Sequence, residues 1–184
     1  MKFDQFSEHA RQILTLEFAG RDREILSGVT SVKQNLNARG VLHSTMTVQS
    51  LAKFFLAEFD ARLELVAKHC ISALRSDDAL IAGTTGSPVG VELFRSVAAE
   101  QFDAIRKAYD GSVETVLASL QSNLPSQIRT DLVDWMNTKT QKRGLAVELQ
   151  YKLAANRPKE LVTLRPTIYD VGIDLKELWK KFFG

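Results

Sequence analysis

The first 82 residues of this chain contain no proline, and their apolar residues recur at intervals of three and four. This spacing is typical of amphipathic α-helices. It predicts one helix from about residue 4 to about residue 40 and a second from about residue 47 to about residue 75. A single helix over both ranges would exceed about 100 Å in length. We therefore expect a turn within residues 40–47.

The second predicted helix carries the broadest apolar face. Its main stripe consists of Val48, Leu51, Phe55, Phe59, Leu63, Val66 and Cys70. A helix that is apolar over so much of its circumference has neighbours on several sides, so we expect it at the centre of the fold. Cys70 is the single cysteine, which excludes an intrachain disulfide. Its apolar surroundings predict a small buried side chain.

Prolines and glycines divide the rest of the chain. A Gly-rich loop at 83–90 precedes a third helix that continues to about Leu120. The residues 110–112 could break this helix, but the apolar register passes through them unchanged, which favours one continuous helix. Pro125 begins a fourth helical region. The polar run at 137–144 leaves two alternatives open there: one helix, or two short helices.

The sequence as a whole predicts an all-α protein, an elongated bundle of four to five long helices. Apolar residues make up 45% and charged residues 25% of the 184 residues, as in ordinary globular proteins. We expect a single domain, with a helical bundle at 1–155 and a C-terminal tail at 156–184 packed on it. The tail combines a β-branched, extended stretch at 161–169 with a short amphipathic helix at its end.

This last helix, residues 172–184, is the clearest candidate for a contact. Residues 139–184 carry ten basic and five acidic side chains, a net charge of +5. The predicted contact residues are Lys176, Trp179, Lys180, Lys181, Phe182 and Phe183. Such a helix can dock on its own bundle, on a protein partner or second copy, or on a membrane surface. The sequence leaves these three alternatives open.

The search for catalytic and metal chemistry yields one pair of residues. The chain has no Glu-x-x-His motif, no His pair at i, i+4 and no cysteine cluster, so we predict no metal and no cofactor. Arg62 and His69 are separated by six residues on the second helix. An Arg followed at this spacing by a His resembles the HEPN domains, all-helical ribonucleases and nucleotide-transferring partners. The resemblance rests on these two residues, and Leu63 stands where that family often has a polar residue.

The HEPN resemblance implies that Arg62 would stabilise a phosphate while His69 acts as general acid or base. The alternative interpretation makes both of them partly solvated residues on a helix face. We favour a non-catalytic helical interaction or assembly module that self-associates or binds a protein partner. A HEPN-like nuclease and a peripheral membrane adaptor that uses residues 172–184 are the alternatives.

Composition and charge indicate which partners and which cellular location to expect for such a module. A net charge of +2 is too small to indicate nucleic acid as a partner. The chain has no apolar run of the length of a signal peptide or of a membrane-spanning helix, so we expect a cytoplasmic protein.

Overall fold

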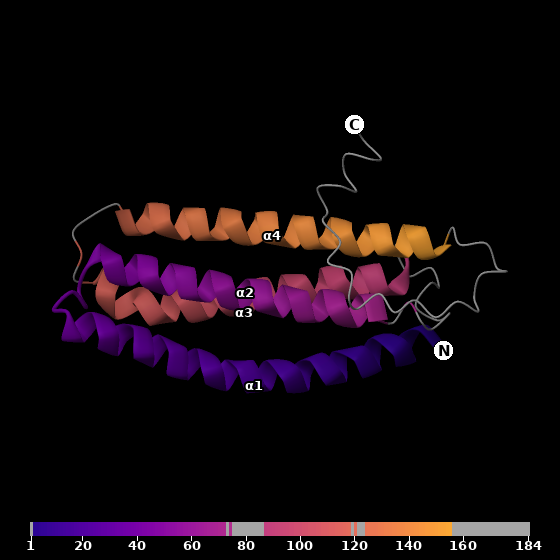
Figure 1. The fold of residues 1–184 in the computed structure, drawn as a ribbon, viewed down its shortest axis with the longest axis horizontal. Coiled ribbons are helices and arrows are strands. Elements are labelled where there is room, and N and C mark those ends of the chain that lie inside the picture. The colour runs from indigo at the N-terminus through magenta and orange to yellow at the C-terminus, as the bar shows by residue number, and fades with distance from the viewer. Residues whose placement is uncertain (1, 73, 75–86, 119, 121–123, 156–184) are drawn as a thin grey trace, which may run out of the picture.

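The computed structural model describes residues 2–72, 74, 87–118, 120 and 124–155. Over these residues the fold is all-α, with no strand. The four helices are α1 (Lys2–Ala38), α2 (Thr45–Ser72), α3 (Val89–Leu117) and α4 (Leu124–Ala155). Consecutive helices run in opposite directions, so the molecule is an elongated up-and-down bundle (Figure 1). The predicted fold class is confirmed.

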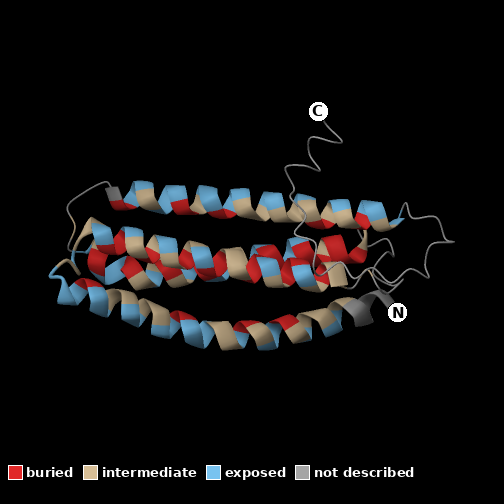
Figure 2. Ribbon diagram, in the orientation of Figure 1, coloured by how far each residue is buried: buried red, intermediate tan, exposed pale blue. Residues whose placement is uncertain are grey.

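Helices α2 and α3 form the middle of the bundle, with α1 on one side and α4 on the opposite side (Figure 1). Helix α2 contacts all three other helices, as its broad apolar face predicts. Phe55 and Phe59 have no exposed surface, and their rings meet Tyr109 and Phe102 of α3 edge to face. The exposed positions of α1 and α4 lie on the outer sides of the bundle (Figure 2).

Helix α1 ends in a hydrogen-bonded turn that requires glycine. Gly40 has a φ of 70°, which side chains with a Cβ rarely adopt. Its N–H donates to the carbonyl of Asn37 at 2.9 Å, and the N–H of Val41 donates to the carbonyl of Leu36 at 3.0 Å. These two bonds define a Schellman motif, which satisfies carbonyls left free at the helix end. The predicted turn within 40–47 is therefore confirmed.

Neither of the two other positions at which a helix could break, 110–112 and 137–144, interrupts a helix. Helix α3 continues through residues 110–112, as predicted. Helix α4 is one helix through 137–144, which settles the alternative that the sequence left open. Its polar middle is matched by carboxylates of α2: Lys139 Nζ lies 2.7 Å from Asp60 Oδ2, and Arg143 lies 3.5 Å from Glu64 Oε2. Ion pairs thus replace apolar contacts over this stretch.

At the end of the bundle near Ala155, Tyr151 holds α2, α3 and α4 together. Its hydroxyl donates to the carbonyl of Cys70 at 2.7 Å, in the last turn of α2, where carbonyls lack helical partners. It also passes so close to Gly90 of α3 that an added Cβ there would lie 1.6 Å from the hydroxyl oxygen. Glycine is therefore required at position 90. Cys70 is fully buried, as predicted.

Three predictions fall outside the described residues. They are the first half of the Gly-rich loop, 83–86, the extended stretch at 161–169 and the terminal helix at 172–184. A fifth helix would belong to the same undescribed part of the chain.

Candidate functional site

Arg62 is the most buried charged residue of the described chain, with 2% of its surface exposed. Each nitrogen of its guanidinium group has a partner. Nε donates to Glu58 Oε1 at 2.9 Å, Nη1 to Gln101 Oε1 at 2.7 Å, and Nη2 to Asp22 Oδ1 at 2.6 Å. The guanidinium group also lies over the ring of Phe18, 5.4 Å from its centroid. The charge of Arg62 is thus compensated within the bundle.

A second arginine completes this network from α1. Arg21 binds both oxygens of Glu58, at 2.8 and 2.9 Å, in the two-pronged geometry that suits a carboxylate. The hydrogen bond to Glu58 raises the pKa of the Arg21 guanidinium group. We call Arg21, Asp22, Glu58, Arg62 and Gln101 the buried network after its two buried members, Glu58 and Arg62; Asp22, at its edge, is 64% exposed. It joins α1, α2 and α3 near the middle of the bundle, where α1 bows outward (Figure 1).

The structure places His69 on the same side of α2 as Arg62, facing α1. Its Nε2 lies 3.2 Å from Glu17 Oε1, and the residue is 26% exposed. It stands seven positions after Arg62, which places the two residues about 10 Å apart along the helix axis. The two side chains share no hydrogen-bond partner among the described residues. The interpretation of Arg62 as a partly solvated residue is wrong, because polar side chains replace water around its guanidinium group. The same interpretation of His69 is confirmed by its partial exposure.

Sequence reasoning did not find the other members of the buried network. One clue was available: Glu58 and Arg62 stand at i, i+4 within the apolar stripe of α2, where a charge needs a partner. The positions of Arg21, Asp22 and Gln101 carry no comparable clue. They are ordinary polar residues on two other helices, and only the packing brings them to Glu58 and Arg62.

The described residues form neither a membrane-spanning helix nor a metal site. None of these helices is both long and apolar enough to cross a bilayer. No group of three or more His, Cys, Asp or Glu side chains in this part of the chain lies close enough to hold a metal ion.

Helix α4 exposes large apolar side chains on its outer face. Leu145 is 68% exposed and Trp135 is 60% exposed, while Leu149 and Leu153 are exposed to a smaller degree. The three leucines follow each other at intervals of four, so they form a row along the helix. We call Trp135, Leu145, Leu149 and Leu153 the outer apolar stripe. Other exposed leucines, Leu16 and Leu26, stand singly on α1.

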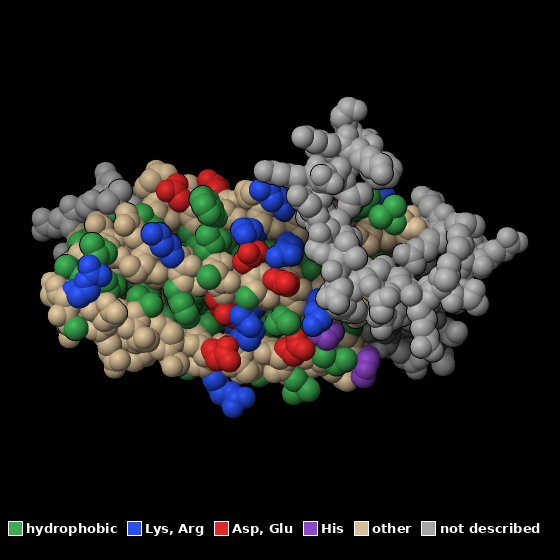
Figure 3. Space-filling view, in the orientation of Figure 1, with side chains coloured by type: hydrophobic (Ala, Val, Ile, Leu, Met, Phe, Trp, Pro, Cys, Tyr) green, Lys and Arg blue, Asp and Glu red, His purple; other side chains and the backbone are tan. Residues whose placement is uncertain are grey.

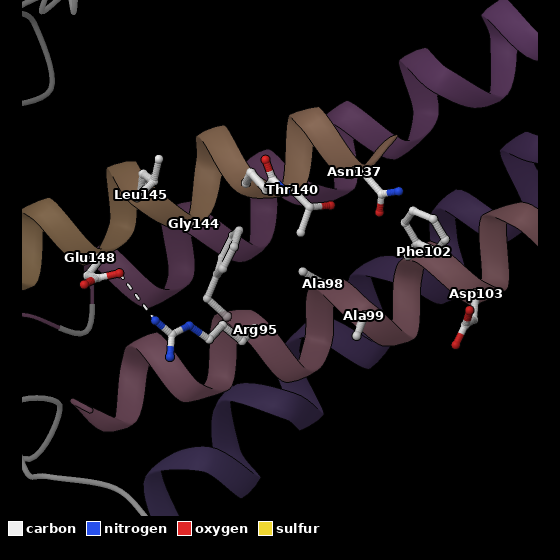
Figure 4. A pocket seen from close by; sticks show the side chains of 12 residues that line it. Arg95, Ala98, Ala99, Phe102, Asp103, Asn137, Thr140, Gly144, Leu145 and Glu148 are labelled. Atoms are coloured by element: carbon white, nitrogen blue, oxygen red, sulfur yellow. Dashed lines mark hydrogen bonds and ion pairs between the residues drawn. The ribbon is translucent and has the colours of Figure 1, made fainter. Parts of the chain in front are cut away.

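A groove of about 650 Å³ runs between α3 and α4 beside this stripe. Its floor is apolar and formed by small or flat side chains: Phe94, Ala98 and Gly144, with Phe102 and Ala99 alongside. In Figure 4 the side chains of α3 and α4 face each other across the opening. The rim is polar, with Asp103, Asn137, Thr140, Gln141 and an ion pair in which Arg95 Nη2 lies 3.4 Å from Glu148 Oε2.

The described residues on the face shown in Figure 3 form no large patch of a single charge. On the face shown in Figure 3, basic and acidic side chains are interspersed with apolar ones. The six predicted contact residues of the C-terminal helix, Lys176 to Phe183, lie outside the described residues. The structure therefore places Arg62 and His69 of the predicted site residues, and it adds the outer apolar stripe and the groove.

A comparison of the chain with protein-family models, with curated proteins and with solved structures finds no match.

Proposed function

We propose that this protein is a non-catalytic helical interaction module that binds through the outer apolar stripe of α4. The stripe takes the apolar face of a helix, offered either by a second copy of the chain or by a protein partner. Helix pairs of this kind contact each other through side chains spaced three and four apart, the spacing of Leu145, Leu149 and Leu153.

One observation carries the proposal: the exposure of this stripe on a helix whose other face is already buried. Met136, Val147 and Tyr151 turn the inner face of α4 into the core. The leucines of the outer face are only partly covered by the bundle, which leaves 39–68% of their surface exposed. Water around three leucines in one row is unfavourable, and covering them on association would release it; Trp135 extends the exposed apolar surface about 15 Å further along the helix.

Sedimentation velocity at micromolar concentration tests the proposal for a second copy. We expect a species heavier than the 20.6 kDa of one chain, and we expect Leu149→Glu to convert it to the monomer. Leu26→Glu is the control on α1, away from the stripe; because Leu26 is 71% and Leu149 39% exposed, circular dichroism also verifies that Leu149→Glu folds. Leu26→Glu should sediment like the original chain.

A protein partner is tested by crosslinking in the source cell, again with Leu149→Glu against Leu26→Glu. An adduct lost only with Leu149→Glu would support the module. If the chain is monomeric and Leu149→Glu changes no adduct, the stripe is not a binding surface and the proposal fails.

The engagement of all three Arg62 nitrogens supports a structural role for this residue rather than a catalytic one. A HEPN-like activity stays testable by incubation with mixed RNA. Cleavage that His69→Ala abolishes, in a variant with an unchanged circular dichroism spectrum, would replace our proposal by the nuclease alternative.

A further inference from the structure

The groove between α3 and α4 differs from the outer apolar stripe in being concave. Its floor residues Ala98 and Gly144 carry no side chain beyond a methyl group, so the space above them between α3 and α4 is not filled. Phe94 and Ala98 are almost fully buried at the bottom, whereas Ala99 is exposed at the side. Such a groove suits a few bulky side chains from one helix rather than a flat surface.

From the groove we infer that its occupant is the segment 172–184 of the same chain. The segment carries six bulky apolar side chains in eleven residues: Ile173, Leu175, Leu178, Trp179, Phe182 and Phe183. Aromatic rings bury large areas and fit an apolar floor flanked by polar rims.

The length of the connecting chain permits this docking. Helix α4 ends at Ala155, and Leu145 at the edge of the groove lies ten residues earlier, about 15 Å along the axis. The connection 156–171 has sixteen residues, and a chain of this length can reach up to about 53–58 Å, well beyond this distance. A short tether that can span the distance to its site gives an effective concentration in the range of about 1 mM.

The charges of groove and segment are complementary. The lining carries two carboxylates, Asp103 and Glu148, against one guanidinium group, Arg95. Asp103 is exposed and has no ion-pair partner in the described part of the chain. The segment carries three lysines, Lys176, Lys180 and Lys181, against Asp174 and Glu177. Its net charge of +1 thus meets a net charge of −1.

A second copy is a weaker candidate for the same groove. At micromolar concentration it is about a thousandfold more dilute than the tethered segment. Its own bundle helices are also covered on their inner faces, and a stable interface between two bundles needs about 800 Å² from each. The groove alone, with about 650 Å³, offers room for a few side chains of one helix.

Trp179 provides a direct probe of this docking. The chain has two tryptophans, so the full-length variant Trp135→Phe reports Trp179 alone. We expect its emission to be blue-shifted relative to the urea-unfolded chain and weakly quenched by acrylamide. Dilution from about 50 μM to about 0.5 μM should change neither property, because tethered docking does not depend on concentration.

A pair of variants in this background locates the site. Ala99→Arg places a long charged side chain in the groove, and we expect a red shift of Trp179 emission with stronger quenching. Ala104→Arg is the matched control on the same helix, since Ala104 is exposed and lies outside the groove lining. It should leave Trp179 unchanged. Both positions are exposed, and circular dichroism verifies that both variants fold.

Four results would overturn the inference. Trp179 with the emission and quenching of the unfolded chain would show that it is not docked. Equal effects of Ala99→Arg and Ala104→Arg, or no effect of either, would place it elsewhere. A red shift on dilution would assign the groove to a second copy, and a blue shift that requires anionic vesicles would assign the segment to lipid. None of these results affects the test of the outer apolar stripe, which uses Leu149.

Discussion

The two sides of the α2–α3 pair use their side chains in opposite ways. On the α1 side, charged residues point inward and are compensated there, as Arg62 and Glu58 show. On the α4 side, ions bridge the helices near the surface through Lys139 and Asp60, while Leu145 and its neighbours point outward. The first side buries charge, and the second exposes apolar surface.

This difference teaches where specificity and binding reside in the molecule. A buried charge network satisfies its hydrogen bonds in one alignment of the helices, so we expect it to determine the register of α1 against α2. The exposed part of the leucine row is not covered by the fold, so covering it on association is favourable. The four predictions below test this contrast, in order of decreasing effect.

The largest effect is expected from Arg62→Ala. It leaves Glu58 and Gln101 partly unpaired in a buried place, which costs about 3–5 kcal/mol of unfolding free energy. The control is Arg11→Ala, because Arg11 forms a 2.7 Å ion pair with Glu100 that is largely exposed and worth less than about 1 kcal/mol. Urea unfolding measures both. Equal losses would mean that burial of the network does not matter.

The second prediction concerns the closely packed end of the α4 side. Gly90→Ala would force Tyr151 away from Cys70, and such overpacking costs about 1–3 kcal/mol. Gly111→Ala is the control in the same helix, where an added Cβ meets no atom within 4 Å; it should stabilise the protein by up to about 1 kcal/mol. A tolerated Gly90→Ala in thermal unfolding would show that Tyr151 moves freely.

The third prediction is a pH dependence that arises from Cys70. Burial raises the pKa of its thiol from 9.0 to about 12, so the folded state resists an ionisation that the unfolded state allows. Stability is therefore complete below pH 9 and falls as the pH rises, by about 1.4 kcal/mol at about pH 10.

Cys70→Ala removes this contribution while the tyrosines and lysines titrate in both proteins. Urea unfolding of both chains at neutral pH and at about pH 10 should show a larger loss for the original chain. Parallel losses would mean that the thiol ionises without cost and is not closed off from water.

The smallest effect is expected from Lys139→Ala on the α4 side. Its ion pair with Asp60 is partly exposed, so the loss should stay below about 1 kcal/mol and decrease at high salt. Lys142→Ala is the control, since Lys142 is exposed on the same helix with no ion pair in the described part of the chain. If Lys139→Ala lost as much free energy of urea unfolding as Arg62→Ala, the two sides of the bundle would not differ in the way described.

The helices themselves could be predicted from the sequence to within a few residues. The apolar period placed α2 at the centre, and the unbroken register through Asp110 and Gly111 predicted a continuous α3. The polar stretch of α4 could not be resolved in this way. Its helical state depends on Asp60 and Glu64, which lie on another helix, and no local pattern contains them.

The candidate sites were less predictable than the fold. Arg62 and His69 were found as a pair by their spacing, but their partners differ, and Arg62 was expected to be partly solvated. The outer apolar stripe was hidden in the sequence, because its leucines have the same spacing as a core-facing row. The periodicity of a helix shows which residues share a face but not which face meets the core.

The sequence by itself thus determined that this protein is an all-α bundle, where its described helices turn, and that α2 lies within it. These properties depend on interactions between residues close in sequence, through helix periodicity, glycine and proline. Only the tertiary structure decided that Arg62 is compensated from α1 and α3, and that Leu145 faces outward beside a groove. Those outcomes depend on how four helices are rotated and aligned against each other, and this arrangement is set by the packing of the whole core rather than by any one segment.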